Sequence, residues 1–508
     1  MTCNEKRQAK RAARDVKNAR DIIEGRTRYM PYEPRKRAQP NRKGGCAPTE
    51  GDYAEMAGRA AGILRVILPG ILAMLADIPD PRAFTRTEHK FPAVMLFGII
   101  MFLGQSRSRR KANEEVAGAG LLELVGDIVP GAASLPHADT LARLLSGIGQ
   151  DELETRYGKL LKEFITSKQF RALHPGKLVV ACDGTQKFAR GYEWDERALS
   201  QNVGVEGRER HYVYLLESVL IMENGITLPL LTEFLENEAG ECVGSAAAKK
   251  QDCETKAFRR LAKRLVKLIG TGTAILLLDG IYASGPVISL CNSCGWDYMI
   301  TLKEGSLPSV WEDFMGLQKM GDNHLISDRC GRRQEYRWSN GHYYTYGNNN
   351  TRLHLNVVTC TETWGEGHIR SGGRPERKRT RYAWLSSLKI SEKNVIERCI
   401  LGRSRWRIEN GFQVEKHRGY SYGHCFSYDW VAMRGFHCLM KYGVFINTLL
   451  LHSAELVDYA SAGSNEGFID KLWGVFRFRG WQKYHDKGKA MVVLKRRRRK
   501  TIFPELAA

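Results

Sequence analysis

The sequence predicts a mixed α/β protein, in which helices cover a central sheet, an all-helical module precedes the sheet, and a strand-rich segment interrupts it. Three observations support this fold class. Apolar residues recur at helical spacing from residue 53 to about 170, and the pattern changes to strands after His174-Pro175-Gly176. The elements that follow have the order β-β-β-α-β-α-β. Antiparallel strands followed by strands joined through helices form a mixed sheet.

The helical module contains apolar segments separated by Pro, Gly and Asp, of which FPAVMLFGIIMFLG (residues 91–104) is the longest uninterrupted one. The segment SRSRRKANEE follows it and places Arg109 and Arg110 directly after a buried helix. This position suits phosphate contacts, so both arginines are candidate DNA-binding residues. A solvated helix end is the alternative.

The predicted sheet begins at KLVVACD, which ends at Asp183. Two further strands, HYVYLLESVLIM and NGITLPLLTEF, meet at an Asn-Gly turn and predict a hairpin. A charged helix (CETKAFRRLAKRLVKLIG) then leads to the apolar strand TAILLLD, to the helix SGPVISLCNSCG and to the strand DYMITLK. The crossovers between these last strands should be right-handed.

Residues 311 to 384 are strand-rich and polar, and a helix returns at Glu392, followed by a long apolar helix over residues 430–451. These changes predict six segments. In chain order they are a basic arm (1–52), the helical module (53–170), the first part of the sheet domain (171–310), a β-rich insertion (311–384), the second part of the sheet domain (385–452) and a basic tail (453–508).

Positive charge is concentrated at the two ends of the chain. The formal net charge is +22, of which residues 1–52 carry +7 and residues 471–508 carry +10. Basic extensions on a nearly neutral body neutralise phosphates, so we expect a polyanion as partner. Solvated, solubilising ends are the alternative, and this includes KRRRRK at 495–500.

The cysteines and apolar stretches indicate a reducing interior and no membrane. Twelve cysteines are scattered through the chain, and the first residues lack the apolar core of a signal peptide. The two longest apolar stretches, 91–104 and 430–451, are too short or too charged to span a bilayer. We therefore expect free thiols and a cytoplasmic location.

Two acidic residues follow two apolar runs: Asp183 ends KLVVAC and Asp279 ends TAILLL. Open α/β sheets bind ligands at the carboxyl ends of their strands. Two carboxylates that face each other repel unless a cation lies between them, so the pair indicates a divalent metal. Taken singly, each aspartate could also cap the turn that follows it.

A third group lies at residues 403–416. On a helix, Arg405, Glu409, Phe412 and Lys416 are spaced four, three and four apart and share one stripe, so that two cations frame a carboxylate. The alternative is a surface salt-bridge ladder. That reading leaves the neighbouring Trp406 unexplained.

In these pieces the chain resembles the bacterial insertion-sequence transposases of the cut-and-paste, DDE type, over residues 171 to about 452. The matching features are VVACDGT, ILLLDGIY, the strand-rich insertion, and a helix in which Arg precedes Glu by four residues and Lys follows Glu by seven. The resemblance implies a ribonuclease-H-like catalytic core. Members with this last signature have Tyr three residues before the Arg, where this sequence has Gly402.

The resemblance also implies residue roles. Asp183, Asp279 and Glu409 would be catalytic and would bind two Mg²⁺ ions, with Mn²⁺ as a substitute. Arg405 and Lys416 would hold DNA phosphates near the scissile bond. Further DNA-binding candidates are Trp406, Arg403, Arg109 and Arg110. Two metals can promote in-line phosphodiester displacement without a side-chain nucleophile.

The implied function is transposition. The protein would bind the terminal repeats of its element, nick the ends, and join the 3′-hydroxyls to target DNA. Double-stranded DNA would be the partner, a homodimer would hold two ends in a synaptic complex, and the protein would associate with the nucleoid. Two alternatives stay open: a transposase-derived DNA-binding protein without cleavage, and a structure-selective nuclease.

Three other glutamates could serve as the third carboxylate. Glu217 and Glu233 lie on the predicted hairpin, and Glu304 follows the strand that ends at Lys303. We prefer Glu409 because it has the flanking cations.

Overall fold

A computed structural model defines the architecture of the chain. It describes residues 50–83, 87–116, 119–204, 207–223, 225–237, 251–321, 323–329, 332–365, 377–461 and 464–479. Almost all of the expected basic arm and the KRRRRK end of the tail lie outside these residues. The chain divides into two units, residues 1–51 and 52–508, and the architecture below belongs to the second.

The N-terminal region is helical, as the sequence predicted. Apolar positions at helical spacing form a series of helices: α2 (Glu50–Leu75), α3 (Phe91–Leu103), α4 (Arg109–Val116), α5 (Ala119–Ile128), α6 (Ala138–Leu145) and α7 (Gln150–Thr166). Helix α3 is buried over nearly its whole length, which explains why its sequence is apolar on every face.

In the described residues, ten strands form one mixed sheet. They are β1 (Leu178–Arg190), β2 (Leu199–Val203), β3 (Arg208–Ile221), β4 (Thr227–Leu235), β5 (Ala274–Leu278), β6 (Asp297–Thr301), β7 (His324–Arg329), β8 (Arg332–Tyr346), β9 (Thr351–Gly365) and β10 (Arg377–Ser386). The order is β2-β3-β1-β5-β6-β10-β9-β8-β7, and β4 also pairs with β3. The predicted hairpin β3–β4 is antiparallel, and β1, β5 and β6 are mutually parallel, as expected.

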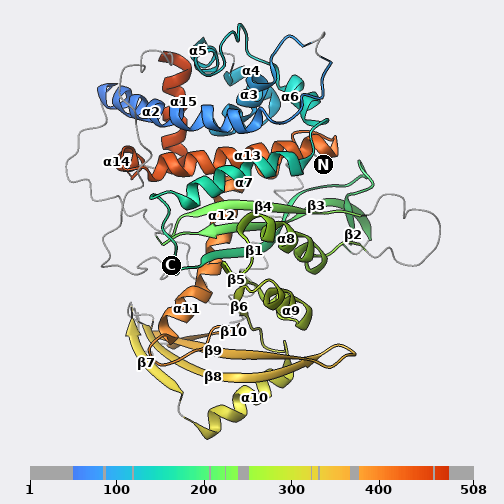
Figure 1. Cartoon of the computed structure of the whole chain (residues 1–508), viewed down its shortest axis with the longest axis vertical. Coiled ribbons are helices and arrows are strands. Elements are labelled where there is room, and N and C mark those ends of the chain that lie inside the picture. The colour runs from blue at the N-terminus through green and yellow to red at the C-terminus, as the bar shows by residue number, and fades with distance from the viewer. Residues whose placement is uncertain are drawn as a thin grey trace, which may run out of the picture. The chain divides into compact units, whose positions relative to one another are not determined.

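The strand-rich segment extends the main sheet. Strand β10 pairs antiparallel with β6, and β9, β8 and β7 continue outward from it (Figure 1). This segment also contains helix α10 (Pro308–Met320), which the sequence pattern did not indicate. The insertion therefore shares its backbone hydrogen bonds with the strands that precede it in the chain.

The remaining helices are α8 (Glu254–Ile269), α9 (Gly285–Ser293), α11 (Val395–Arg403), α12 (Arg407–His417), α13 (Trp430–His452), α14 (Val457–Ser461) and α15 (Asn465–Arg479), with short 3₁₀ turns η2 (Gly280–Tyr282) and η3 (Ser404–Trp406). Helices α14 and α15 correct the expectation of a basic tail from residue 453. Phe468, Trp473 and Phe476 of α15 are buried, so the chain remains part of the core to this helix.

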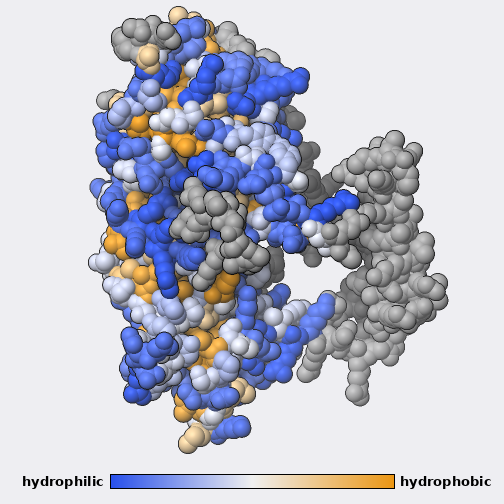
Figure 2. Space-filling view, turned by 90° about the vertical axis from the view of Figure 1, so that its right-hand side faces the viewer, coloured by the Kyte–Doolittle hydropathy of each residue, from blue (hydrophilic) through white to orange (hydrophobic). Residues whose placement is uncertain are grey.

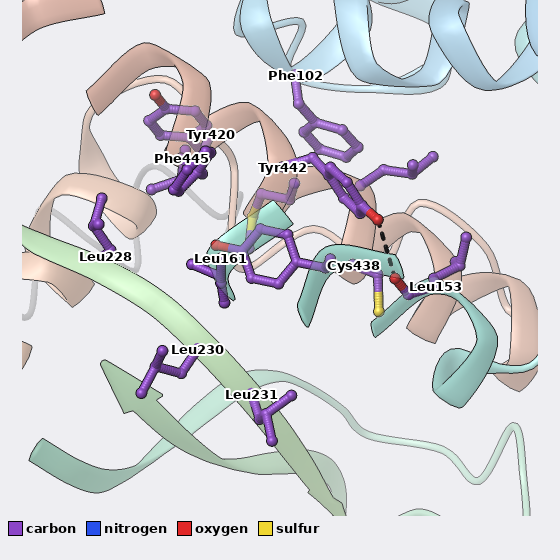
Figure 3. Packing of buried hydrophobic residues seen from close by; sticks show 14 of the residues in the cluster. Phe102, Leu153, Leu161, Leu228, Leu230, Leu231, Tyr420, Cys438, Tyr442 and Phe445 are labelled. Atoms are coloured by element: carbon purple, nitrogen blue, oxygen red, sulfur yellow. Dashed lines mark hydrogen bonds between the residues drawn. The ribbon is translucent and has the colours of Figure 1, made fainter. Parts of the chain in front are cut away.

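One apolar core joins the N-terminal helices to the sheet. Residues of α3, α7, α13 and β4 belong to the same buried cluster. Figure 3 shows Phe102, Leu161, Leu230 and Phe445 in this cluster, and the Tyr442 hydroxyl donates a hydrogen bond to the carbonyl of Leu153 over 3.0 Å. The helical module and the sheet therefore stabilise each other.

One described helix, residues 52–75, is long and apolar enough to cross a membrane by length and composition. It was not one of the two stretches singled out in the sequence. More than half of its apolar window is buried inside the structure, and Ile63, Leu64 and Leu68 are completely buried. These contacts are those of a core helix.

Candidate active site

Strand geometry brings Asp183 and Asp279 to one face of the sheet. Alternate residues of β1 enter two different cores, and Val179 and Ala181 enter the smaller one, which α11 and α12 cover. Asp183 continues their phase. On β5, Ile275 and Leu277 enter the same core, and Asp279, two residues after Leu277, lies on the same side of the sheet. Because Cys182 is paired with Leu278 in the parallel register, the two aspartates that follow them are adjacent.

One of the two aspartates departs from the backbone position that the sequence predicted. Asp279 does follow the last residue of β5 and precedes η2. Asp183 does not end its strand, because β1 continues to Arg190. It lies where its shorter neighbour β5 stops, so its side chain still faces an open end of the sheet.

Arg405 connects all three predicted carboxylates. One guanidinium nitrogen, Nη1, lies 2.9 Å from Asp183 Oδ2, and the other, Nη2, lies 2.9 Å from Glu409 Oε1 and 3.9 Å from Asp279 Oδ1. Arg405 lies in η3 and Glu409 one turn later in α12, so the predicted spacing of four places both on one side. The structure thus brings together residues that are more than 200 positions apart in the chain.

Burial and charge give the two aspartates opposite pKa shifts. Burial raises the pKa of Asp183 to about 6; the positive charge of Arg405 opposes this, and the nearby charges of Asp279 and Glu409 add to it. Burial also raises the pKa of Asp279, but hydrogen bonds from Lys303 Nζ and from the Gly280 N–H outweigh it, and the net pKa lies below its ordinary value. Such a divergence between neighbouring acids is typical of catalytic sites.

The carboxylates line a cavity of about 530 Å³ that also contains Lys303, Glu304 and Trp406. Lys303 Nζ donates to Asp279 Oδ2 over 2.8 Å. Trp406 is about half exposed, and the Arg405 guanidinium lies 5.3 Å from its ring centroid. Sequence reasoning missed Lys303 as a partner of Asp279, although it follows β6, the strand next to β5.

The other predicted cations occupy separate places. Lys416, at the end of α12, donates to the hydroxyl of Thr185 on β1, two residues beyond Asp183. Arg403 pairs with the buried carboxylate of Glu362 and lies 4.7 Å from the ring centroid of Tyr382. Arg403 therefore connects α11 to the strands β9 and β10, and its DNA contact stays a prediction.

The space beside Gly402 accounts for the departure from the Tyr-containing signature. A Cβ atom at this position would lie 2.7 Å from atoms of the Trp384 indole, which is closer than a carbon contact allows. Trp384 comes from β10 and lines the same cavity as the carboxylates. A tryptophan from the strand-rich segment thus occupies the space where a side chain on residue 402 would begin.

The rival glutamates have other partners. Glu217 is buried and accepts hydrogen bonds from Tyr422, Thr232 and His437, and it pairs with Lys441 over 3.0 Å. Lys441 also pairs with Glu415 of α12 over 2.7 Å, so this cluster ties α13 to α12 and β3.

Glu233 and Glu304 differ in their surroundings. Glu233 lies 2.5 Å from Arg260 and 2.7 Å from Arg264, both on α8. Glu304 lines the carboxylate cavity, but it is largely exposed and lies 3.8 Å from Arg381. Of the three rivals, Glu304 shares the site.

The donor set suits a hard divalent cation. Carboxylate oxygens are the ligands that Mg²⁺ and Mn²⁺ prefer, and three carboxylates outnumber the two cations, Arg405 and Lys303, that contact them. In the part of the chain that the structure describes, however, no three His, Cys, Asp or Glu side chains are placed to share one ion. The guanidinium of Arg405 lies between the carboxylates, so a bound cation would compete with it for the same oxygens.

Comparisons with known proteins give little beyond this geometry. No model of a protein family matches the chain, and no characterised protein matches it in sequence. One similar solved structure is a cryo-electron microscopy structure of a piggyBac transposase synaptic complex with hairpin DNA. The identity is 11%, the TM-score is 0.37, and the match covers 85% of this chain and 83% of that chain. A TM-score of this size establishes no shared fold, so the assignment below rests on the residues of this chain.

Proposed function

We propose that the chain is a DNA transposase whose catalytic centre consists of Asp183, Asp279 and Glu409. The observation that carries the proposal is the convergence of these carboxylates on the two nitrogens of one arginine, in a cavity that also contains a lysine and an exposed tryptophan. A cluster of acids alone would repel DNA. Acidic residues beside basic ones suit a site where the acids bind a metal ion and the basic side chains bind DNA phosphates.

Each residue has a role in this proposal. Asp183, Asp279 and Glu409 hold two Mg²⁺ ions, which when bound supply Lewis-acid activation at the scissile phosphate. Arg405 balances the negative charge of the carboxylates and of the phosphate. Lys416 of α12, which contacts Thr185 of β1, holds a neighbouring backbone phosphate, and Trp406 offers an aromatic face to an unstacked base.

The proposed reaction is hydrolytic nicking at the ends of the element, followed by transfer of the freed 3′-hydroxyls to target DNA, on a ribonuclease-H-like core. The N-terminal helices would recognise the terminal repeats, and a homodimer would hold two ends together. The concentration of positive charge at both ends of the chain supports a polyanionic partner of this kind.

A second candidate function is DNA binding without cleavage. It is favoured by one observation: Arg405 already pairs with the oxygens that a metal would need. If Arg405 keeps this position when DNA binds, the protein positions DNA and does not cut it. A structure-selective nuclease is the third possibility, since it would need the same carboxylates.

A substrate panel separates these functions. Wild type and Asp279→Asn are incubated with Mg²⁺ and with duplexes that carry paired terminal repeats of the element, random sequence, or branched junctions. The transposase proposal predicts that wild type cuts and joins only the paired repeats, and that Asp279→Asn binds them without cutting. Cleavage of branched DNA alone would instead identify a nuclease, and binding by wild type without any cleavage would identify a DNA-binding protein.

A further inference from the structure

A second cavity, of about 730 Å³, lies at the other end of β1 and shares no lining residue with the carboxylate cavity. It is bounded by the first turn of α4, by the loop 424–428 that precedes α13, and by Arg190, the last residue of β1. Arg109 and Arg110 of α4 line it together with His424 and Tyr428. We call this cavity the Arg190 pocket.

The Arg190 pocket carries a surplus of positive charge. Its two lining acids are already paired, Asp139 with Arg109 over 2.8 Å and Glu114 with Arg110 over 3.3 Å. Arg190 donates to the Tyr428 hydroxyl and to the Ala189 carbonyl, and among the described residues it lies within 4.0 Å of no carboxylate. The guanidinium of Arg190 is therefore available for an anion from outside.

One of the two histidines that line the pocket, His424, lies in the same positive field. Burial lowers the pKa of His424, and repulsion by Lys187, Arg190 and Arg109 lowers it further. These three cations come from β1 and α4, so their charges converge on the loop that closes the cavity.

Aromatic rings lie in and beside the pocket: Phe426 and Tyr428 line it, whereas Tyr192 adjoins Tyr428 and Phe188 adjoins Arg190. Tyr428 and Tyr192 are each about half exposed, and their hydroxyls are hydrogen-bonded to each other over 3.2 Å. Arg190 lies 6.0 Å from the Tyr428 ring centroid and 4.9 Å from that of Phe188. Hydroxyl donors and guanidinium groups beside exposed rings suit a sugar-phosphate backbone. On the side of the molecule that faces right in Figure 1, the described surface is mostly hydrophilic with separate hydrophobic patches (Figure 2).

We propose that the Arg190 pocket binds a backbone phosphate of the same DNA duplex whose scissile phosphate lies at the carboxylates. This inference rests on the proposed function and fixes the path of the DNA. Strand β1 connects the two places, from Asp183 to Arg190. A bulge between Gln186 and Phe188 takes up one residue of β1, so the span from Asp183 to Arg190 has about six residue steps. At roughly 3.3 Å per step the separation is about 20 Å, which corresponds to about six base pairs at roughly 3.4 Å each.

A partly exposed cation lies along this path. Lys416 is held on Thr185, between the carboxylates and the Arg190 pocket. Arg405, Lys416 and Arg190 thus follow β1 in order. Three cations along one strand give the backbone of a duplex successive contacts, and the pocket is the contact farthest from the chemistry.

Phosphate-ethylation interference tests this path. The probe is a duplex carrying one terminal repeat, the phosphate at the outer boundary of that repeat defines position zero, and binding is measured without Mg²⁺ so that no cleavage is required. Wild type is compared with the double variant Arg109→Ala/Arg190→Ala, with Arg190→Lys, and with Arg143→Ala as a matched control, an exposed arginine of α6 outside the pocket. Thermal unfolding establishes that each variant is folded.

The proposal predicts that ethylation in a window about six base pairs from position zero weakens binding of wild type, Arg190→Lys and Arg143→Ala. In the double variant this interference disappears, while interference at other phosphates remains. Its affinity for the duplex falls roughly tenfold, and the salt dependence of binding decreases by about one released ion per lost contact. Two results would overturn the proposal: interference in that window that persists in the double variant, or no interference in that window in wild type. If wild type shows interference in this window but never cuts paired ends, the pocket proposal stands and the catalytic assignment of the carboxylates fails.

Discussion

Arg405 is the residue on which the electrostatics of the candidate site depend. Its side chain is only 8% exposed, and it contacts Asp183, Glu409 and Asp279 with two nitrogens. Without it, three neighbouring carboxylates would face one another with Lys303 as the compensating cation. Arg405 therefore balances the charge of these carboxylates, and a bound metal ion would compete with it for the same oxygens.

This competition predicts a metal-dependent stability. Replacing Arg405 by Ala should destabilise the protein by about 3 kcal/mol in EDTA, because removing one partner leaves buried like charges uncompensated. Addition of Mg²⁺ should then raise the melting temperature of the variant more than that of wild type, since the ion binds oxygens that the arginine no longer occupies. Thermal unfolding with EDTA and with Mg²⁺ measures both effects.

Arg405→Lys is the control, because it keeps one positive charge and should respond to Mg²⁺ like wild type. An Arg405→Ala variant with unchanged stability in EDTA and no added response to Mg²⁺ would show that the carboxylates do not form a cation site.

At this scale the sequence predicted the essential grouping. The ends of two apolar runs predicted that Asp183 and Asp279 lie at one edge of the sheet, the helical spacing of four put Arg405 and Glu409 on one stripe, and the resemblance grouped Glu409 with the two aspartates. The contribution of Trp384 was not predictable, because it depends on the pairing of β10 with β6. That pairing joins residues more than 80 positions apart, and single-sequence patterns do not encode it.

At the scale of elements, α12 carries Glu409 and is fixed from two sides. On one side Lys416 contacts Thr185 of β1, and on the other the buried cluster of Glu217, Lys441 and Glu415 connects α12 to β3 and α13. Burial raises the pKa of Glu415, and the charge of Lys441 opposes that rise. The position of α12 thus depends on α13.

Helix α13 in turn packs closely against α3, and glycines on both helices allow this, Gly98 on α3 and Gly443 on α13. A Cβ on Gly443 would lie 2.7 Å from Phe102 Cβ and 3.1 Å from its backbone carbonyl carbon, so Gly443→Ala should force the helices apart and destabilise the protein by about 2 kcal/mol. A lower midpoint of chemical unfolding measures this effect.

Gly474 on α15 is the matched control, since a Cβ there meets nothing within 4 Å and alanine favours helices. We expect Gly474→Ala to leave stability unchanged or slightly raised. Equal destabilisation by both substitutions would contradict the close α3–α13 contact.

Element types were more predictable than their connections. Periodicity located the N-terminal helices, the hairpin β3–β4 and the parallel strands β5 and β6. It did not indicate α10, nor that β7 to β10 extend the same sheet, because strand order follows from packing between distant segments. It also ended the core too early, at residue 452, since the short amphipathic helix α15 lies next to a strongly basic segment whose composition dominates the pattern.

At the scale of the whole molecule, one apolar core supports both the N-terminal helices and the sheet. The carboxylate cavity and the Arg190 pocket lie on parts of this single body, and β1 contributes to both. A duplex held at both places would be fixed in register, so that the distance from a recognised sequence to the cut is set by the length of a strand.

The measurement that tests the central claim most directly is DNA cleavage by the matched pair Glu409→Gln and Glu304→Gln. Both glutamates line the same cavity, but Arg405 pairs with Glu409, whereas Glu304 is largely exposed. With Mg²⁺ and paired terminal repeats, we predict that Glu409→Gln binds DNA like wild type and cuts at least about a hundredfold more slowly, while Glu304→Gln cuts normally. Normal cutting by Glu409→Gln, with loss of cutting in Glu304→Gln, would contradict the assignment of the third carboxylate.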